Sequence, residues 1–169
     1  MAVAINFFLF QAGWLACVLG AARGFPWQGA LVALLIAAFI VFRSRYPRAE
    51  LALVAAAAAA GFVFDSALAL TGWVDFAGAV PAPLLSPVWM VALWALFATT
   101  LNVSLRWLRE WPALGVLFGA VGGPVAYYAG ERLGALQFAD PVLGLTAVAA
   151  GWAMATPLLL AFARRLEAR

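Results

Sequence analysis

Few side chains in this sequence can do chemistry, and the most unusual of them is Asp65, in the apolar stretch GFVFDSALAL (61–70). A second group of ionisable and hydroxylated side chains lies in the stretch GAVGGPVAYYAGERLGA (119–135). Such groups can take up or release a proton, or hold a ligand that carries a charge or a hydroxyl group. The candidate pocket drawn from the two stretches consists of Asp65, Tyr127, Tyr128, Glu131 and Arg132.

The composition decides what surrounds these residues. Of the 169 residues, 67% are hydrophobic and only 10% are charged, which is far too few charges for a soluble domain of this length. Histidine is absent and cysteine occurs once, as Cys17, so His-ligated metals and internal disulfides are excluded. We therefore expect a polytopic membrane protein with no metal and no cofactor.

Apolar runs long enough to cross a bilayer predict an all-α bundle of six transmembrane helices, forming a single domain over residues 1–169. The second run is near the lower length limit for a span. No internal repeat relates the first three runs to the last three. The predicted spans are 4–22, 26–42, 50–71, 86–106, 112–133 and 141–163.

The arginines predict the orientation of these spans, since positive charge collects on the cytoplasmic side of a membrane. Only Arg23 and Arg132 lie on one side of the predicted bundle. Both termini are therefore predicted to be cytoplasmic. Arginine in the complete absence of lysine, with abundant alanine, is typical of a GC-rich bacterial genome, so we expect a multi-pass protein of the inner (plasma) membrane. The arginines on the other side are Arg43, Arg45, Arg48, Arg106, Arg109, Arg164, Arg165 and Arg169.

The helical rise puts Asp65 about 22 Å from the cytoplasmic end of its span, in the outer half of the membrane. At that depth lie the two tyrosines of span five, with Glu131 and Arg132 one turn higher, and Gln28 is also within reach. We expect Asp65 to point into the bundle and to face Arg132 rather than Glu131, since a buried carboxylate needs a partner. Asp65 either forms a functional site or clamps two helices together through Arg132 or a tyrosine.

A second set of polar residues lies in the cytoplasmic half of the predicted spans. Buried amides and hydroxyls in a membrane form hydrogen bonds between helices. This polar tier either holds spans one, four and six together or contacts a ligand. Its members are Asn6, Gln11, Thr99, Asn102 and Thr156.

Three stretches resemble an uncharacterised family of small bacterial inner-membrane proteins, catalogued as a domain of unknown function. They are NFFLFQAGWLACV (6–18), PVWMVALWALFATTLNVSLRWL (87–108) and the stretch 119–135. The resemblance covers nearly the whole chain. It implies no particular activity and favours a lipid-related role.

The sequence lacks the catalytic motifs of serine hydrolases, zinc proteases and P-loop enzymes. We therefore expect a non-catalytic accessory or stabilising partner in lipid or envelope processes. One alternative is a transporter or binding protein for a lipid or small molecule, using the pocket around Asp65. Another is a membrane enzyme that acts on a lipid. The expected partners are membrane lipids and another membrane protein or a second copy, with no nucleic acid.

Overall fold

The computed structural model describes residues 2–79, 82 and 84–167. Arg169, which is one of the arginines in the predicted cytoplasmic tail, lies outside the described residues. Prolines at the first helical position begin four of the helices, where the missing N–H would have no intrahelical partner anyway. The helices are α1 (Val3–Ala22), α2 (Pro26–Arg43), α3 (Pro47–Leu70), α4 (Val88–Ala98), α5 (Pro112–Arg132) and α6 (Pro141–Glu167), and a 3₁₀ helix spans Arg106–Glu110.

Five of these helices, all except α4, are long and apolar enough to cross a membrane. They begin and end within a few residues of the predicted spans. Large apolar side chains such as Phe8, Leu35 and Leu158 are exposed on the outside of the bundle, where lipid would cover them. The fold is therefore that of a helical membrane protein, as the composition predicts.

The fourth helix differs from its predicted range of 86–106, because α4 ends at Ala98 and residues 99–105 form turns. The hydroxyls of Thr99 and Thr100 donate to the carbonyls of Leu96 and Phe97, each at 2.7 Å. Threonine side chains that bond to backbone carbonyls three residues earlier compete with the helical pattern. The prediction of a continuous helix was wrong here, and the polar residues of the predicted span mark the point where the helix unwinds.

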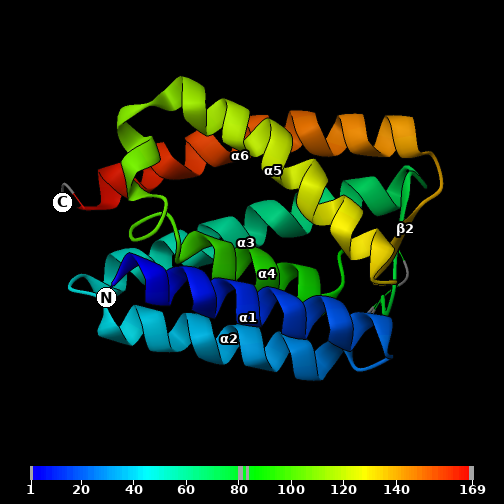
Figure 1. Ribbon diagram of the computed structural model, residues 1–169, viewed down its shortest axis with the longest axis horizontal. Coiled ribbons are helices and arrows are strands. Elements are labelled where there is room, and N and C mark those ends of the chain that lie inside the picture. The colour runs from blue at the N-terminus through cyan, green and yellow to red at the C-terminus, as the bar shows by residue number, and fades with distance from the viewer. Residues whose placement is uncertain (1, 80–81, 83, 168–169) are drawn as a thin grey trace.

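Four of the helices form two pairs, and α3 and α4 join these pairs (Figure 1). α1 packs on α2, and α5 packs on α6. α4 contacts α1, α2 and α3, and α3 in turn contacts α6, so these two helices link the pairs. Among the described residues, α1 and α5 share no comparable packing interface.

The two ends of the bundle are different (Figure 1). Both termini lie at one end, with the α2–α3 and α4–α5 connections, and we call this the terminal end. The opposite end, which we call the ribbon end, carries two short antiparallel strands, β1 (Val74–Phe76) and β2 (Leu136–Phe138). The sequence analysis did not predict these strands, because three residues are too few for an alternating pattern to be recognised. The arginine-rich loops belong to the terminal end, and its cytoplasmic location stays a prediction.

Candidate functional site

Asp65 is completely buried and joins three helices of the bundle. Its Oδ1 accepts a hydrogen bond from the Tyr127 hydroxyl on α5. Its Oδ2 accepts a hydrogen bond from the indole Nε1 of Trp94 on α4, at 2.9 Å. The carboxylate therefore points into the bundle, and a tyrosine rather than an arginine is its partner from α5.

Glycine at position 61 lets Trp94 reach this carboxylate. Gly61 lies one helical turn before Asp65 on α3, and a Cβ at that position would overlap the indole ring of Trp94. Without a side chain at Gly61, the indole packs closely against α3 and its N–H donates to Asp65. The local sequence GFVFD thus provides both the acceptor and the space for its donor.

Glycines on α5 position a second tryptophan in the same way. A Cβ at Gly119 would overlap the backbone oxygen of Trp152 on α6, and a Cβ at Gly123 would overlap its indole ring. This close approach of α5 to α6 is the contact that a GxxxG pattern favours. Trp152 then stacks on Trp94 with ring centroids 4.4 Å apart and planes inclined by 20°.

The structure separates the other members of the predicted pocket from Asp65. Arg132 is exposed, so the prediction that it faces Asp65 was wrong. It follows Tyr127 by five residues, and positions five apart point to different faces of a helix. Tyr128 is 51% exposed on the outside of α5. Glu131 instead accepts a hydrogen bond from the backbone N–H of Phe138 at 3.0 Å, which ties α5 to β2, and Gln28 is exposed.

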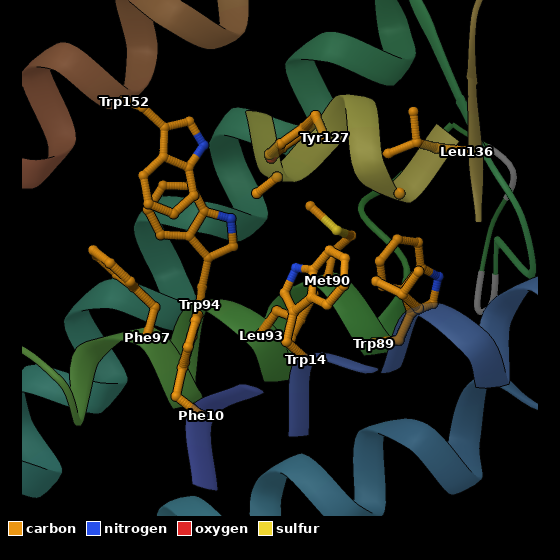
Figure 2. Close-up of a pocket in the computed structure, with 13 residues that line it drawn as sticks. Phe10, Trp14, Trp89, Met90, Leu93, Trp94, Phe97, Tyr127, Leu136 and Trp152 are labelled. Carbon is orange, nitrogen blue, oxygen red and sulfur yellow. The ribbon is translucent and has the colours of Figure 1, made fainter. Parts of the chain in front are cut away.

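A cavity of about 60 Å³ lies beside Tyr127 and is lined almost entirely by aromatic and aliphatic side chains (Figure 2). The sequence analysis did not select its tryptophans as site residues. For Trp14, Trp94 and Trp152, the available signal was a position in the middle of the predicted spans, away from the membrane interfaces where tryptophan is common. The side chains drawn and labelled in Figure 2 are Phe10, Trp14, Trp89, Met90, Leu93, Trp94, Phe97, Tyr127, Leu136 and Trp152.

A second cavity, of about 160 Å³, adjoins the first on the side of the terminal end. Phe10, Phe97, Ala126 and Trp152 line both cavities, so the two lie next to each other between α1 and α5. We call the two cavities together the α1–α5 groove. It follows α5 from Gly130 at the ribbon end back to Phe118, which is about 18 Å at 1.5 Å per residue.

The predicted polar tier does not form one cluster. Asn6 is completely buried, and its side chain donates to the Thr99 carbonyl at 3.2 Å and accepts from the Ser104 hydroxyl at 2.7 Å and the Ser104 backbone N–H at 3.2 Å. These bonds join α1 to the unwound end of α4. Gln11 is exposed on α1 and takes no part in this contact.

The remaining two members of the tier make no hydrogen bond with Asn6 among the described residues and have other neighbours. Thr156 is buried on α6 beside Gly119 of α5. Asn102 donates to Glu50 on α3 at 2.6 Å, at the terminal end of the bundle. Within the described part of the chain, no three carboxylate or cysteine side chains lie close enough together to hold a metal ion.

Comparison with models of protein families shows to which family this chain belongs. A family model described as "Protein of unknown function (DUF2878)" matches residues 3–158, which is most of the sequence. The chain belongs to this family. The match agrees with the resemblance to an uncharacterised family of membrane proteins, and it assigns no activity to DUF2878. Comparison with curated proteins and with solved structures gives no match.

Proposed function

We propose that this protein binds the hydrocarbon chain of a membrane lipid in the α1–α5 groove, in a non-catalytic accessory role. The observation that carries the proposal is a pair of neighbouring aromatic-lined cavities between two helices that share no extensive packing interface among the described residues. The proposal also places the protein in the bacterial inner membrane with the terminal end in the cytoplasm, as the arginine distribution predicts.

The chemistry of the groove suits a hydrocarbon chain and does not suit water. Its lining offers very few polar atoms, and apolar cavities in proteins stay free of water. Inside a membrane, a gap between two helices is filled by the acyl chains of the surrounding lipids. The groove is about 18 Å long, and one leaflet of hydrocarbon is about 15 Å thick, half of a core of about 30 Å. A single lipid chain therefore matches the length of the groove.

The polar groups at the ribbon half of the groove would limit how far a chain enters and which chain fits. Tyr127 lines the groove with its hydroxyl already bonded to Asp65. The buried indole N–H of Trp152 makes no hydrogen bond of ordinary geometry among the described residues, although it is directed toward the Tyr127 hydroxyl, on the side of the ring that faces Tyr127 in Figure 2. An oxygen atom on the bound chain, such as a carbonyl or hydroxyl, would accept from this N–H.

The hydrogen bonds of Asp65 support a non-catalytic role over catalysis on the lipid. Both carboxylate oxygens are already used within the protein, by Tyr127 and by Trp94. A general acid or base needs an oxygen that reaches the substrate. Asp65 instead fixes the positions of two side chains that form the wall of the groove.

Lipid retained by the purified protein tests the proposal. Ala126 lines both cavities, so Ala126→Phe fills the groove with a ring. Ala113 lies exposed on the same helix, so Ala113→Phe is the matched control. Both proteins are purified in mild detergent, and their bound lipid is quantified by native mass spectrometry. We expect Ala126→Phe to lose most of the lipid that wild type and Ala113→Phe retain. Equal lipid content in all three proteins would refute binding in the groove.

A further inference from the structure

A polar cavity of about 600 Å³ lies at the terminal end of the bundle, separate from the α1–α5 groove in its lining residues. We call it the terminal-end cavity. Its walls come from α1, α2, the α2–α3 loop, α3, the unwound segment after α4, and the end of α6. Its volume is in the range of small-molecule sites in proteins. Its charged and amide side chains are Arg43, Arg45, Glu50, Asn102, Arg106 and Glu167.

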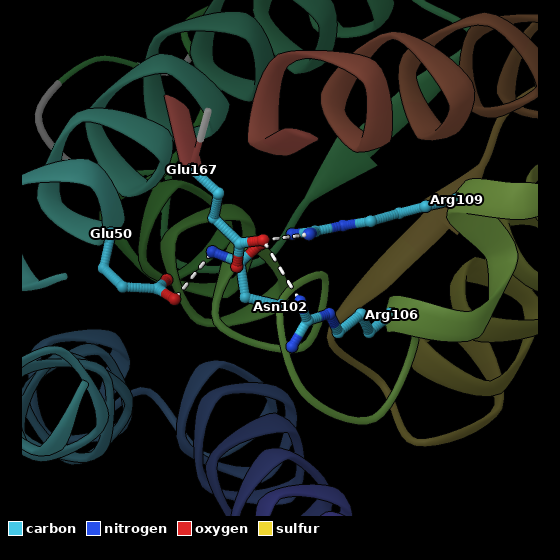
Figure 3. Close-up of polar contacts among 5 residues, drawn as sticks. All are labelled: Glu50, Asn102, Arg106, Arg109 and Glu167. Carbon is cyan, nitrogen blue, oxygen red and sulfur yellow. Dashed lines mark hydrogen bonds and ion pairs between the residues drawn. The ribbon is translucent and has the colours of Figure 1, made fainter. Parts of the chain in front are cut away.

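Two hydrogen-bond acceptors in this cavity's wall have no donor among the residues that the structure describes. Glu50 is only 4% exposed, and its Oε1 accepts from the Asn102 side-chain N–H at 2.6 Å. Its Oε2 has no partner in the described part of the chain, and neither does the Oδ1 of Asn102. Figure 3 shows both side chains meeting between α3 and the unwound segment. Buried acceptors of this kind are nearly always satisfied, so this pair can accept hydrogen bonds from a donor that the described residues do not supply.

The second carboxylate in the cavity's wall is already paired. Glu167 accepts from Arg109 at 2.7 Å and from Arg106 at 3.5 Å, as Figure 3 also shows. Arg43 and Arg45 form no ion pair with a carboxylate among the described residues. The cavity thus combines free acceptors at Glu50 with guanidinium groups that lack an anionic partner.

From this arrangement we propose that the terminal-end cavity binds a ligand that carries both a protonated amine and a phosphate, the chemistry of phosphoethanolamine. The amine donates to Glu50 Oε2 and Asn102 Oδ1. The phosphate is held by Arg43 and Arg45, since guanidinium groups bind phosphate oxygens in a strong, charge-assisted way.

Ligands with a single charge fit less well. An anion alone would leave both buried acceptors without a donor and would lie close to the Glu50 carboxylate. A cation alone would be repelled by Arg43 and Arg45, whose charge no carboxylate among the described residues balances. A zwitterion satisfies both halves of the cavity. Its source is either the headgroup of a lipid or a free amino-phosphate in solution, and this chemistry is the same for both.

Binding to the full chain in detergent, measured by isothermal titration, tests the proposal. The probes are phosphoethanolamine, phosphocholine and inorganic phosphate. Phosphocholine carries the same charges but has no N–H to donate, so we expect it and inorganic phosphate to bind about tenfold or more weakly than phosphoethanolamine, the value of a hydrogen bond to a charged group. A short-chain phosphatidylethanolamine compared with a short-chain phosphatidylglycerol forms the lipid arm. If the protein prefers phosphatidylethanolamine over phosphatidylglycerol but does not bind free phosphoethanolamine, the ligand is a lipid headgroup. If it prefers both ethanolamine compounds over their comparison probes, the site also binds the free compound.

Variants locate the site. Glu50→Gln keeps the shape of the side chain and removes its charge, and we expect it to weaken phosphoethanolamine binding about tenfold or more. Arg45→Gln should weaken binding, whereas Arg48→Gln should not, because Arg48 is exposed in the same region and does not line the cavity. If Glu50→Gln does not fold, the comparison of Arg45→Gln with Arg48→Gln and the comparison of phosphocholine with phosphoethanolamine still test the proposal. No binding of any probe, equal binding of phosphate and phosphoethanolamine, or equal effects of the two arginine variants would overturn the proposal.

Discussion

Replacing Asp65 tests how far one buried carboxylate holds the bundle together. Asp65→Leu would leave two buried donors, the Trp94 N–H and the Tyr127 hydroxyl, without an acceptor. Each unsatisfied buried group costs about 1–3 kcal/mol, so the free energy of unfolding should fall by about 2–6 kcal/mol. Hydrogen bonds measured in membrane bundles average only about 0.6 kcal/mol, which favours the lower part of that range.

Asp65→Asn separates the shape of the side chain from its charge. The amide oxygen can still accept from Trp94, and the amide N–H can donate to the Tyr127 hydroxyl, which is able to act as an acceptor. Two neutral hydrogen bonds then replace two bonds to a carboxylate. We expect a loss of only about 1 kcal/mol. The folded variant should retain lipid in the groove nearly as wild type does, because the positions of Trp94 and Tyr127 are preserved.

The assay is unfolding in mixed micelles with increasing dodecyl sulfate, followed by helical circular dichroism. Val63→Leu on the lipid-facing side of α3 is the control and should change stability by no more than about 0.5 kcal/mol. Tyr127→Phe, alone and combined with Asp65→Leu, measures the coupling of the pair. The reasoning fails if Asp65→Leu is as stable as the control, or if Asp65→Asn is as damaging as Asp65→Leu.

Three further outcomes are expected. Asn6→Leu should lower the free energy of unfolding by about 2 kcal/mol in the same assay, because it removes three hydrogen bonds to the unwound end of α4, whereas Gln11→Leu should change it little. Gly61→Ala should cost about 1–3 kcal/mol through overlap with an indole ring, but Gly122→Ala, where a Cβ meets only ordinary contacts, should be neutral or stabilising. Reporter fusions should place the C-terminus in the cytoplasm and Gly78 in the periplasm, and the reverse would contradict the arginine-based orientation.

The boundaries of most helices could be predicted from the sequence, because proline, glycine and arginine mark the ends of the apolar runs. The unwinding after Ala98 could not be predicted from the sequence, because an apolar window with two threonines and one asparagine still resembles a membrane span. What stabilises the unwound segment is Asn6, which is 93 residues away from its partner Thr99 along the chain. Hydropathy and helical periodicity cannot detect such a contact, because both are read within one local window.

The sequence did not determine which residue is the partner of Asp65, for a similar reason. Depth along a helix, which the sequence supplies, left tyrosine and arginine both possible. The choice depends on the rotation of α5 about its axis, which the glycine contacts with α6 determine. Trp94 was not considered because an indole in an apolar run looks like ordinary core. Its N–H becomes informative only beside a buried acceptor.

The hydrogen bonds of Asn6 and of Asp65 explain why α1 and α5 are held apart with the α1–α5 groove between them. Lipid chains are as apolar as leucine, so helices in a membrane associate through close packing and hydrogen bonds rather than through the hydrophobic effect. Asn6 holds α1 to the end of α4, and Asp65 holds α5 to α3 and α4. Each contact fixes one side of the groove to α4, and neither joins α1 to α5 directly. Large rings, such as Phe10 and Trp152, then line the space between them. Moving α1 or α5 to close the groove would strain one of these contacts, which favours the lipid chain that we propose over a rearranged helix as the occupant.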